Sequence, residues 1–187
     1  MKPLTPTTPH VIIMVGIPGA GKSTFTEHFS KTFNAPVVDY DKAFNIVGSV
    51  QAASQVTDLL LDQLLKTRHT LIYEGPTSNK AGRAAVIKKI TTAGYQPLLV
   101  WVQTESAEAL RRSTKKQSGK AAMTAAEFDT AIRSFGAPTP EERPVVISGK
   151  HTYATQLKVV LKHLAGPPRP ESPEQPRVRS GRNIIVR

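Results

Sequence analysis

Cysteine is absent from the 187-residue sequence, which excludes disulfide bonds and zinc sites built from thiolates. The sequence also lacks any apolar run of the roughly 18 residues that a transmembrane helix needs. Aromatic residues make up 6% of the chain and include a single tryptophan, so few side chains are available to stack on nucleic-acid bases. From these absences we expect a cytoplasmic protein that does not enter a membrane.

Acidic residues are outnumbered in the sequence. It has 14 Asp and Glu against 25 Lys and Arg, which gives a formal net charge of +11 at pH 7. A basic balance favours polyanionic partners, because the release of counterions drives their association. A generic solubilising surface has the same composition, so the charge makes DNA a candidate partner without identifying it.

Short apolar runs alternate with helix-like segments between residues 10 and 165. This alternation predicts a single α/β domain with a five-stranded parallel sheet that helices flank on both faces. The predicted strands are VIIMV (11–15), VV (37–38), HTLIYEG (69–75), QPLLVWVQT (96–104) and PVVISG (144–149). The predicted helices are 22–33, 54–65, 80–93, 106–116, a helix with a capping box at Thr124 and Glu127, and 152–164.

The two ends of the chain differ from this domain in composition. Residues 1–9 are rich in Pro and Thr, and we expect a flexible N-terminus. Residues 166–187 contain five Pro and five Arg, which is typical of an extended tail. Within the tail, the run from Ile184 to Val186 is apolar and can add a strand to a sheet edge, on this molecule or on another.

The segment GIPGAGKS, residues 16–23, matches the phosphate-binding pattern G-x-x-x-x-G-K-S. It follows a predicted strand and precedes a predicted helix, which is the context in which this pattern binds a nucleotide. Lys22 can reach the β- and γ-phosphates, and the Ser23 hydroxyl can ligate Mg²⁺. The expected nucleotide-binding residues are Gly16, Pro18, Gly19, Ala20, Gly21, Lys22, Ser23 and Thr24.

Three carboxylates come at the ends of predicted strands. Asp39 and Asp41 follow the second strand, and Glu74 ends the third. Because ligands of parallel α/β sheets bind beyond the carboxyl ends of the strands, we expect at least one aspartate to orient or deprotonate a hydroxyl acceptor. Glu74 is a candidate ligand of Mg²⁺, directly or through water. A solvated turn that ends in a helix cap is the alternative interpretation of the two aspartates.

Four blocks occur in order along the chain: VGIPGAGKSTF, VVDYDKAF, YEGPTSNKAGR and ALRRSTKK. Together they resemble the P-loop polynucleotide kinase-like family, the AAA_33-type ATP-binding kinases, and among them the phage 5-hydroxymethyluracil DNA kinases. The resemblance covers residues 10–165 and implies a kinase domain that transfers the γ-phosphate of ATP to a hydroxyl group with Mg²⁺. A phage-encoded member would act in the cytoplasm of the host cell.

The resemblance also implies roles for individual residues. The family places the acceptor's base shortly after the second strand, where Asp41 matches better than Asp39. Its basic helical lid matches the helix that carries Arg112, with Lys116 on the same helical face. The nucleic-acid end kinases of the family often have an arginine three residues after the base, and this sequence has Phe44 there.

This departure favours the hydroxymethyl group of 5-hydroxymethyluracil in DNA as the acceptor over a 5′-hydroxyl end. A base inside a duplex must be flipped out of the stack, and Tyr40 or Phe44 can stack on it, with core packing as the alternative role. Arg83 belongs to a basic predicted helix and is expected to line the acceptor channel. Two other functions remain open: a small-molecule or zeta-toxin-like kinase, and a nucleotide-switched binding module.

We expect deletion of residues 166–187 to weaken binding to DNA and to reduce its salt dependence, because arginines on phosphates release counterions. The measurement is the dissociation constant for a DNA duplex as a function of salt, for the full and the shortened chain. An unchanged slope would show that the tail makes no phosphate contacts.

Overall fold

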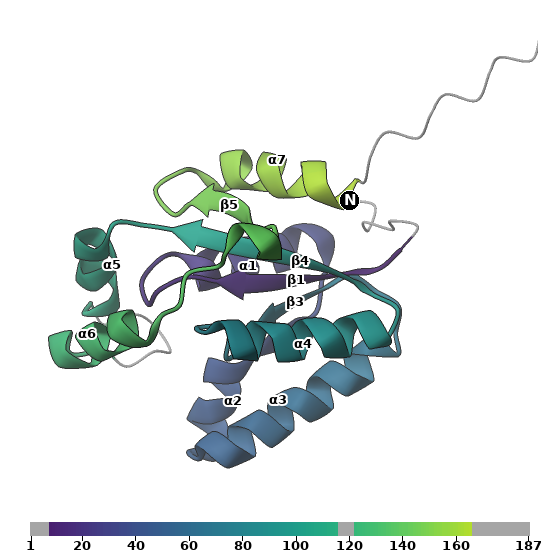
Figure 1. Ribbon diagram of the computed structural model, residues 1–187, viewed down its shortest axis with the longest axis horizontal. Helices are drawn as coiled ribbons and strands as arrows, with labels where there is room; N and C mark the ends of the chain where they lie inside the picture. The colour runs from purple at the N-terminus through teal and green to yellow at the C-terminus, as the bar shows by residue number, and fades with distance from the viewer. Residues whose placement is uncertain (1–7, 116–121, 166–187) are drawn as a thin grey trace, which may run out of the picture.

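The computed structural model describes residues 8–115 and 122–165, and in this part of the chain a sheet lies between two layers of helices (Figure 1). The strands are β1 (His10–Val15), β2 (Val37–Asp39), β3 (Leu71–Glu74), β4 (Gln96–Gln103) and β5 (Val145–Ser148). The helices are α1 (Lys22–Phe33), α2 (Tyr40–Val47), α3 (Val50–Leu65), α4 (Lys80–Thr92), α5 (Ser106–Ser113), α6 (Ala125–Ser134), the 3₁₀ helix η1 (Pro140–Glu142) and α7 (Tyr153–Leu164).

The five strands form one sheet in the order β2-β3-β1-β4-β5, and every neighbouring pair is parallel. All six residues of the central strand β1 are buried, as expected for a strand covered on both faces. The prediction of an α/β fold with a five-stranded parallel sheet flanked by helices is therefore confirmed.

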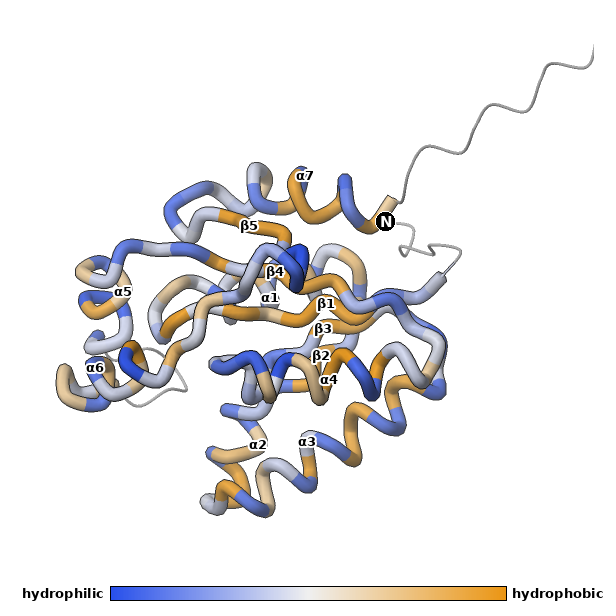
Figure 2. The backbone as a smooth tube through the Cα atoms, in the orientation of Figure 1, coloured by the Kyte–Doolittle hydropathy of each residue, from blue (hydrophilic) through white to orange (hydrophobic). Residues whose placement is uncertain are grey.

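Alternate residues of β1 contribute to two separate cores, because successive side chains of a strand point to opposite faces. Ile12 and Met14 pack with α1 and α7 on one face. Val11 and Ile13 pack with α3 and α4 on the other. Figure 2 shows the apolar residues concentrated along these strands, while the helices carry apolar and polar residues side by side.

Helix α2 is an element that the sequence analysis did not predict. Asp39 begins it by accepting a hydrogen bond from the Lys42 N–H (3.0 Å), and Gly48 ends it with a φ of 66°. Eight residues between two caps are too few for a clear helical period, so the local caps define this helix. The predicted capping box of Thr124 and Glu127 at the start of α6 is confirmed.

The structure also revises the predicted ends of elements. Helix α3 begins at Val50, four residues before the predicted start, because the Ser49 hydroxyl caps it. Helix α5 ends at Ser113, earlier than predicted. The expected N-terminal segment is described only from Thr8, and the expected tail 166–187 lies outside the described residues. Among the described helices, none combines the length and the apolar character that crossing a membrane would require.

Candidate active site

The phosphate-binding loop connects β1 to α1 through glycines in backbone conformations that disfavour other residues. Gly16, Gly19 and Gly21 have φ values of 149°, 73° and 107°. A Cβ atom on Gly16 would lie 2.6 Å from the Val102 carbonyl oxygen, and one on Gly19 would overlap the Ala109 carbonyl oxygen. Glycine thus lets the loop lie directly against the end of β4 and against α5.

Helix α1 presents its N-terminus to this loop. Gly21 occupies the cap position without a side chain, and the first turn carries no acidic residue, so the backbone N–H groups there suit an anion. The Lys22 ammonium donates to the carbonyl oxygens of Gly16 (2.8 Å) and Ile17 (3.1 Å), which holds it over the loop.

Three oxygen-bearing side chains lie in a row beside the loop, at the carboxyl edge of the sheet. The Ser23 hydroxyl donates to Glu74 Oε1 at 3.1 Å. Glu74 lies next to Asp39 in the register of β3 and β2. The Asp39 side chain is only 9% exposed, and besides capping α2 it forms an ion pair with Lys42 (3.4 Å). The sheet thus brings together three residues that the sequence separates by up to 51 positions.

Hydroxyl and carboxylate oxygens are the ligands that Mg²⁺ prefers, so Ser23 and Glu74 fit this ion. Among the described residues there is no group of three His, Cys, Asp or Glu side chains that could hold a metal by itself. Mg²⁺ commonly binds through one or two protein oxygens and completes its shell with water and substrate phosphates. Ser23 and Glu74 match such a site, in which the protein supplies two oxygen ligands and water and phosphates supply the rest.

Asp41 lies in the first turn of α2 and is exposed. Phe44 lies three residues further along, on the same helical face, with 38% of its surface exposed. Tyr40, at the start of the helix, is half-buried. The arrangement leaves Asp41 and Asp39 as alternative bases, and the roles of Tyr40 and Phe44 in binding an acceptor stay predictions.

Arg112 reaches the loop from α5. Its Nε donates to Glu108 Oε1 (2.7 Å), and its Nη1 donates to the Gly149 carbonyl oxygen (3.0 Å). Nη1 also lies 3.9 Å from the point where a Cβ of Gly21 would be. Hydrogen bonds from Arg111 and Arg112 lower the pKa of Glu108 to about 2, which keeps this carboxylate charged and Arg112 in place. The predicted lid residue Lys116 lies outside the described residues.

The turn after β5 also packs on the phosphate-binding loop, although none of the expected nucleotide-binding residues lies in this turn. The Gly149 N–H donates to the Gln103 carbonyl oxygen (2.8 Å), and the Thr104 hydroxyl donates to the Ala20 carbonyl oxygen (2.9 Å). A Cβ on Gly149 would overlap both Ala20 and Thr104. The signal in the sequence for this close approach is Gly149, which comes directly after the last strand.

Arg83 does not line an acceptor channel, which corrects the sequence expectation. Its side chain is fully buried and forms a two-pronged ion pair with Glu142 of η1, at 2.7 and 2.9 Å. The guanidinium also donates to the carbonyl oxygens of Thr77 (3.1 Å) and Gly136 (2.7 Å). Arg83 therefore joins α4 to the segment between α6 and β5, and a buried cation needs all of these acceptors.

Thr77 extends this network to the central strand. Its hydroxyl donates to the Met14 carbonyl oxygen at 2.8 Å. The loop that follows Glu74 is thereby held from both sides, by β1 and by Arg83. Arg83 supports the position of the Glu74 strand end without facing the site.

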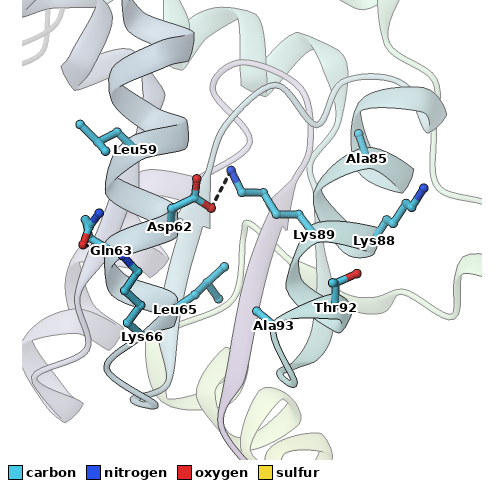
Figure 3. A pocket seen from close by; sticks show the side chains of 10 residues that line it. All are labelled: Leu59, Asp62, Gln63, Leu65, Lys66, Ala85, Lys88, Lys89, Thr92 and Ala93. Carbon is cyan, nitrogen blue, oxygen red and sulfur yellow. Dashed lines mark hydrogen bonds and ion pairs between the residues drawn. The ribbon is translucent and has the colours of Figure 1, made fainter.

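A hollow of about 900 Å³ lies between α3 and α4, away from all these residues (Figure 3). Lys89 extends across it to Asp62, at 2.9 Å. Most of its lining comes from the second half of each helix and the residue that follows it, which lie toward the amino ends of the strands. It is therefore separate from the phosphate-binding edge, and no predicted site residue lines it.

The sheet order and the glycine loop ahead of α1 define a P-loop α/β domain. The family model AAA_33, an AAA domain, matches residues 11–138, and the chain belongs to this family. A search of curated proteins finds no match.

Solved structures agree with this fold. A gluconokinase from Sinorhizobium meliloti 1021 is 16% identical with a TM-score of 0.64, covering 84% of this chain and 92% of its own. The Mycobacterium tuberculosis APS kinase CysC, in complex with AMPPNP and APS, is 18% identical with a TM-score of 0.65, covering 84% and 98%. A chain of the Pnkp1/Rnl/Hen1 RNA repair complex is 19% identical with a TM-score of 0.60, covering 68% and 44%. The fold is that of the P-loop kinases.

We expect Arg83→Ala to lower the free energy of unfolding by about 3–5 kcal/mol, because Glu142 and the carbonyl oxygens lose a buried partner. Urea denaturation at neutral pH measures this change. Lys88→Ala, at an exposed position of the same helix, is the matched control and should change stability by less than about 0.5 kcal/mol. Equal effects of the two substitutions would contradict the structural role of Arg83.

The same pair has an expected pH dependence. Arg83 lowers the pKa of Glu142 from 4.5 to about 2, so the stabilisation is complete above pH 4.5 and is lost as the pH falls toward 2. The difference in stability between the wild type and Arg83→Ala should narrow over that range. A constant difference would contradict an ionic contribution.

Proposed function

We propose that the protein transfers the γ-phosphate of ATP to a hydroxyl group of DNA. The favoured acceptor is the hydroxymethyl group of 5-hydroxymethyluracil, with a 5′-hydroxyl end as the second choice. The observation that carries phosphoryl transfer is the contact of Ser23 with Glu74, with Asp39 adjacent, beside a phosphate-binding loop. Binding of a nucleotide with Mg²⁺ would account for Ser23 and Glu74 alone, whereas a second carboxylate beside them, Asp39, favours transfer to a hydroxyl group.

Each residue has a defined task in this proposal. Lys22 and the N–H groups of the loop bind the β- and γ-phosphates, and Arg112 stabilises charge on the transferred group. Ser23 and Glu74 would hold Mg²⁺, which supplies positive charge to the phosphates when bound. Asp41 orients the acceptor hydroxyl and accepts its proton.

The surface of α2 supports an acceptor that has an apolar face. Phe44 follows Asp41 by one turn, and beyond it Ile46 and Val47 are 84% and 37% exposed. A nucleobase can stack on such a surface, whereas a polyhydroxylated sugar gains little from it. Charge adds to this support, because the chain as a whole is strongly basic.

A small-molecule kinase is the second candidate, because most of the net positive charge that supports a DNA acceptor lies outside the described domain. The described residues hold 17 Lys and Arg and 12 Asp and Glu, so they account for +5 of the net +11. The larger share lies in segments outside the described residues. The gluconokinase and the APS kinase also match more of this chain than the RNA repair protein does.

The acceptor is tested by transfer of labelled γ-phosphate from ATP to three DNA oligonucleotides. One has free 5′-hydroxyls, one has phosphorylated ends, and one has phosphorylated ends and internal 5-hydroxymethyluracil. We expect label on the third. Label on the first alone would identify an end kinase, and label on none of them, with transfer to free nucleosides or sugars, would establish the second candidate.

We expect Asp41→Asn to reduce kcat by at least about 10²-fold while ATP binding is kept, which is the scale of losing a general base. Steady-state kinetics of phosphoryl transfer and a nucleotide-binding titration measure the two quantities. Asp39→Asn is the informative comparison, since asparagine still caps α2. If Asp39→Asn shows the larger loss, the base is Asp39; Asp62→Asn, remote from the site, should have no effect.

A further inference from the structure

Thr77 lies in the loop between β3 and α4, and each of its polar groups forms a hydrogen bond. Its hydroxyl donates to the Met14 carbonyl oxygen (2.8 Å), and its N–H donates to the Gly75 carbonyl oxygen (2.7 Å). Its carbonyl oxygen accepts from Arg83 Nη1 (3.1 Å). Only 4% of its surface is exposed. Because a buried residue with all of its polar groups paired cannot shift without breaking a hydrogen bond, Thr77 fixes the course of the loop that follows Glu74.

The rest of this loop is closely packed. A Cβ atom on Gly75 would overlap the ring of Tyr73. One on Gly82, in the first turn of α4, would overlap the Pro76 carbonyl oxygen. Asn79 caps α4 by accepting a hydrogen bond from the Gly82 N–H (2.8 Å). The chain between β3 and α4 therefore has little room to move, and a shift at one end of the loop displaces the other end as well.

The Thr77 hydroxyl closes a ring that contains the whole phosphate-binding loop. Met14, which accepts its hydrogen bond, lies two residues before Gly16, where the phosphate-binding loop begins. At the other end of that loop, the Ser23 hydroxyl donates to Glu74 Oε1 at 3.1 Å. Glu74 precedes Thr77 by three residues, so the chain between them completes the ring. Two hydrogen bonds, one at each end of the phosphate-binding loop, therefore join it to the segment that follows β3.

We infer that Thr77 is a positioning residue, which holds Glu74 where it binds Mg²⁺ together with Ser23. This inference rests on the proposed function, in which Ser23 and Glu74 would hold the ion. Thr77 acts through Glu74 and not as a ligand, because it is buried and its hydroxyl is directed to the Met14 carbonyl oxygen. Removing a group that orients a metal ligand typically lowers metal affinity by about 10- to 100-fold. The loss of the Thr77 hydroxyl should therefore weaken the contribution of Mg²⁺ to nucleotide binding.

A second buried threonine provides the matched control. Thr57 of α3 is 2% exposed, and its hydroxyl has no hydrogen-bond partner within the part of the chain that the structure describes. Valine has the same branched shape as threonine and lacks the hydroxyl. Thr77→Val therefore removes the link to Met14, whereas Thr57→Val removes a buried hydroxyl that makes no such link.

The experiment measures the affinity of the full chain for the ATP analogue AMPPNP, without Mg²⁺ and over a series of Mg²⁺ concentrations. Phosphoryl transfer to the DNA oligonucleotides is measured at the same Mg²⁺ concentrations. The variants are Thr77→Val, Thr77→Ser, Thr57→Val, Glu74→Gln and the double variant with Thr77→Val and Glu74→Gln. Far-UV circular dichroism and urea denaturation confirm that each variant is folded, and Thr77→Ala replaces Thr77→Val if the valine variant does not fold.

Positioning predicts that the Mg²⁺ concentration needed for half-maximal strengthening of AMPPNP binding rises about tenfold or more in Thr77→Val. It should stay at the wild-type value in Thr57→Val, and in Thr77→Ser, which keeps the hydroxyl. Binding without Mg²⁺ should be unchanged in Thr77→Val, because Lys22 and the N–H groups of the phosphate-binding loop are intact. In the Glu74→Gln background, Thr77→Val should have no further effect on the Mg²⁺ dependence, since the two residues act as one unit.

Equal weakening of AMPPNP binding with and without Mg²⁺, or loss of the fold in both Thr77→Val and Thr77→Ala, would show that Thr77 only stabilises the domain and would overturn the inference. An unchanged Mg²⁺ dependence in Thr77→Val would overturn it as well, as would wild-type binding that does not respond to Mg²⁺. An effect that persists in the Glu74→Gln background would exclude action through Glu74. The proposed function fails separately, if the wild type binds AMPPNP with Mg²⁺ but transfers phosphate to no acceptor.

Discussion

The site depends on close approaches between backbones that glycine alone permits. Gly16 lies against the end of β4, Gly19 against α5, and Gly149 against the phosphate-binding loop itself. Any side chain at these positions would meet a carbonyl oxygen, which cannot move as a flexible side chain can. Because these glycines have no side chains, β4, α5 and the turn after β5 can pack directly around one loop. This packing positions Arg112 and the carboxylates at the strand ends.

The sequence predicted the sheet and the phosphate-binding loop because both follow from local patterns. Apolar β-branched runs mark strands, and the glycine spacing marks the loop wherever the chain places it. The proximity of Ser23, Glu74 and Asp39 followed from a topological rule, since carboxyl ends of parallel strands share one edge. Which side chains are neighbours on that edge, such as Asp39 and Glu74, depends on the order of the strands in the sheet. This order could not be predicted from the single sequence.

Arg83 shows where such reasoning fails and which signal was available. Its charge suggested a surface role, yet it lies three and seven residues before Val86 and Ile90, the two other buried residues of α4. The helical period therefore put Arg83 on the core face, and its partner Glu142 comes from a distant segment. Helix α2 was missed for a different reason, since it is defined by caps at its two ends and not by a period.

Helix α1 starts with a lysine, has no acidic residue in its first turn and has no capping side chain. Each of these features is unfavourable for an isolated helix, whose N-terminus is stabilised by negative charge. The helix is therefore incomplete by itself, and a bound phosphate supplies the charge that its own sequence withholds. A ligand that binds only the folded domain raises its free energy of unfolding, so the stability of the domain increases with the occupancy of this site. The nucleotide therefore stabilises the fold in addition to taking part in the reaction.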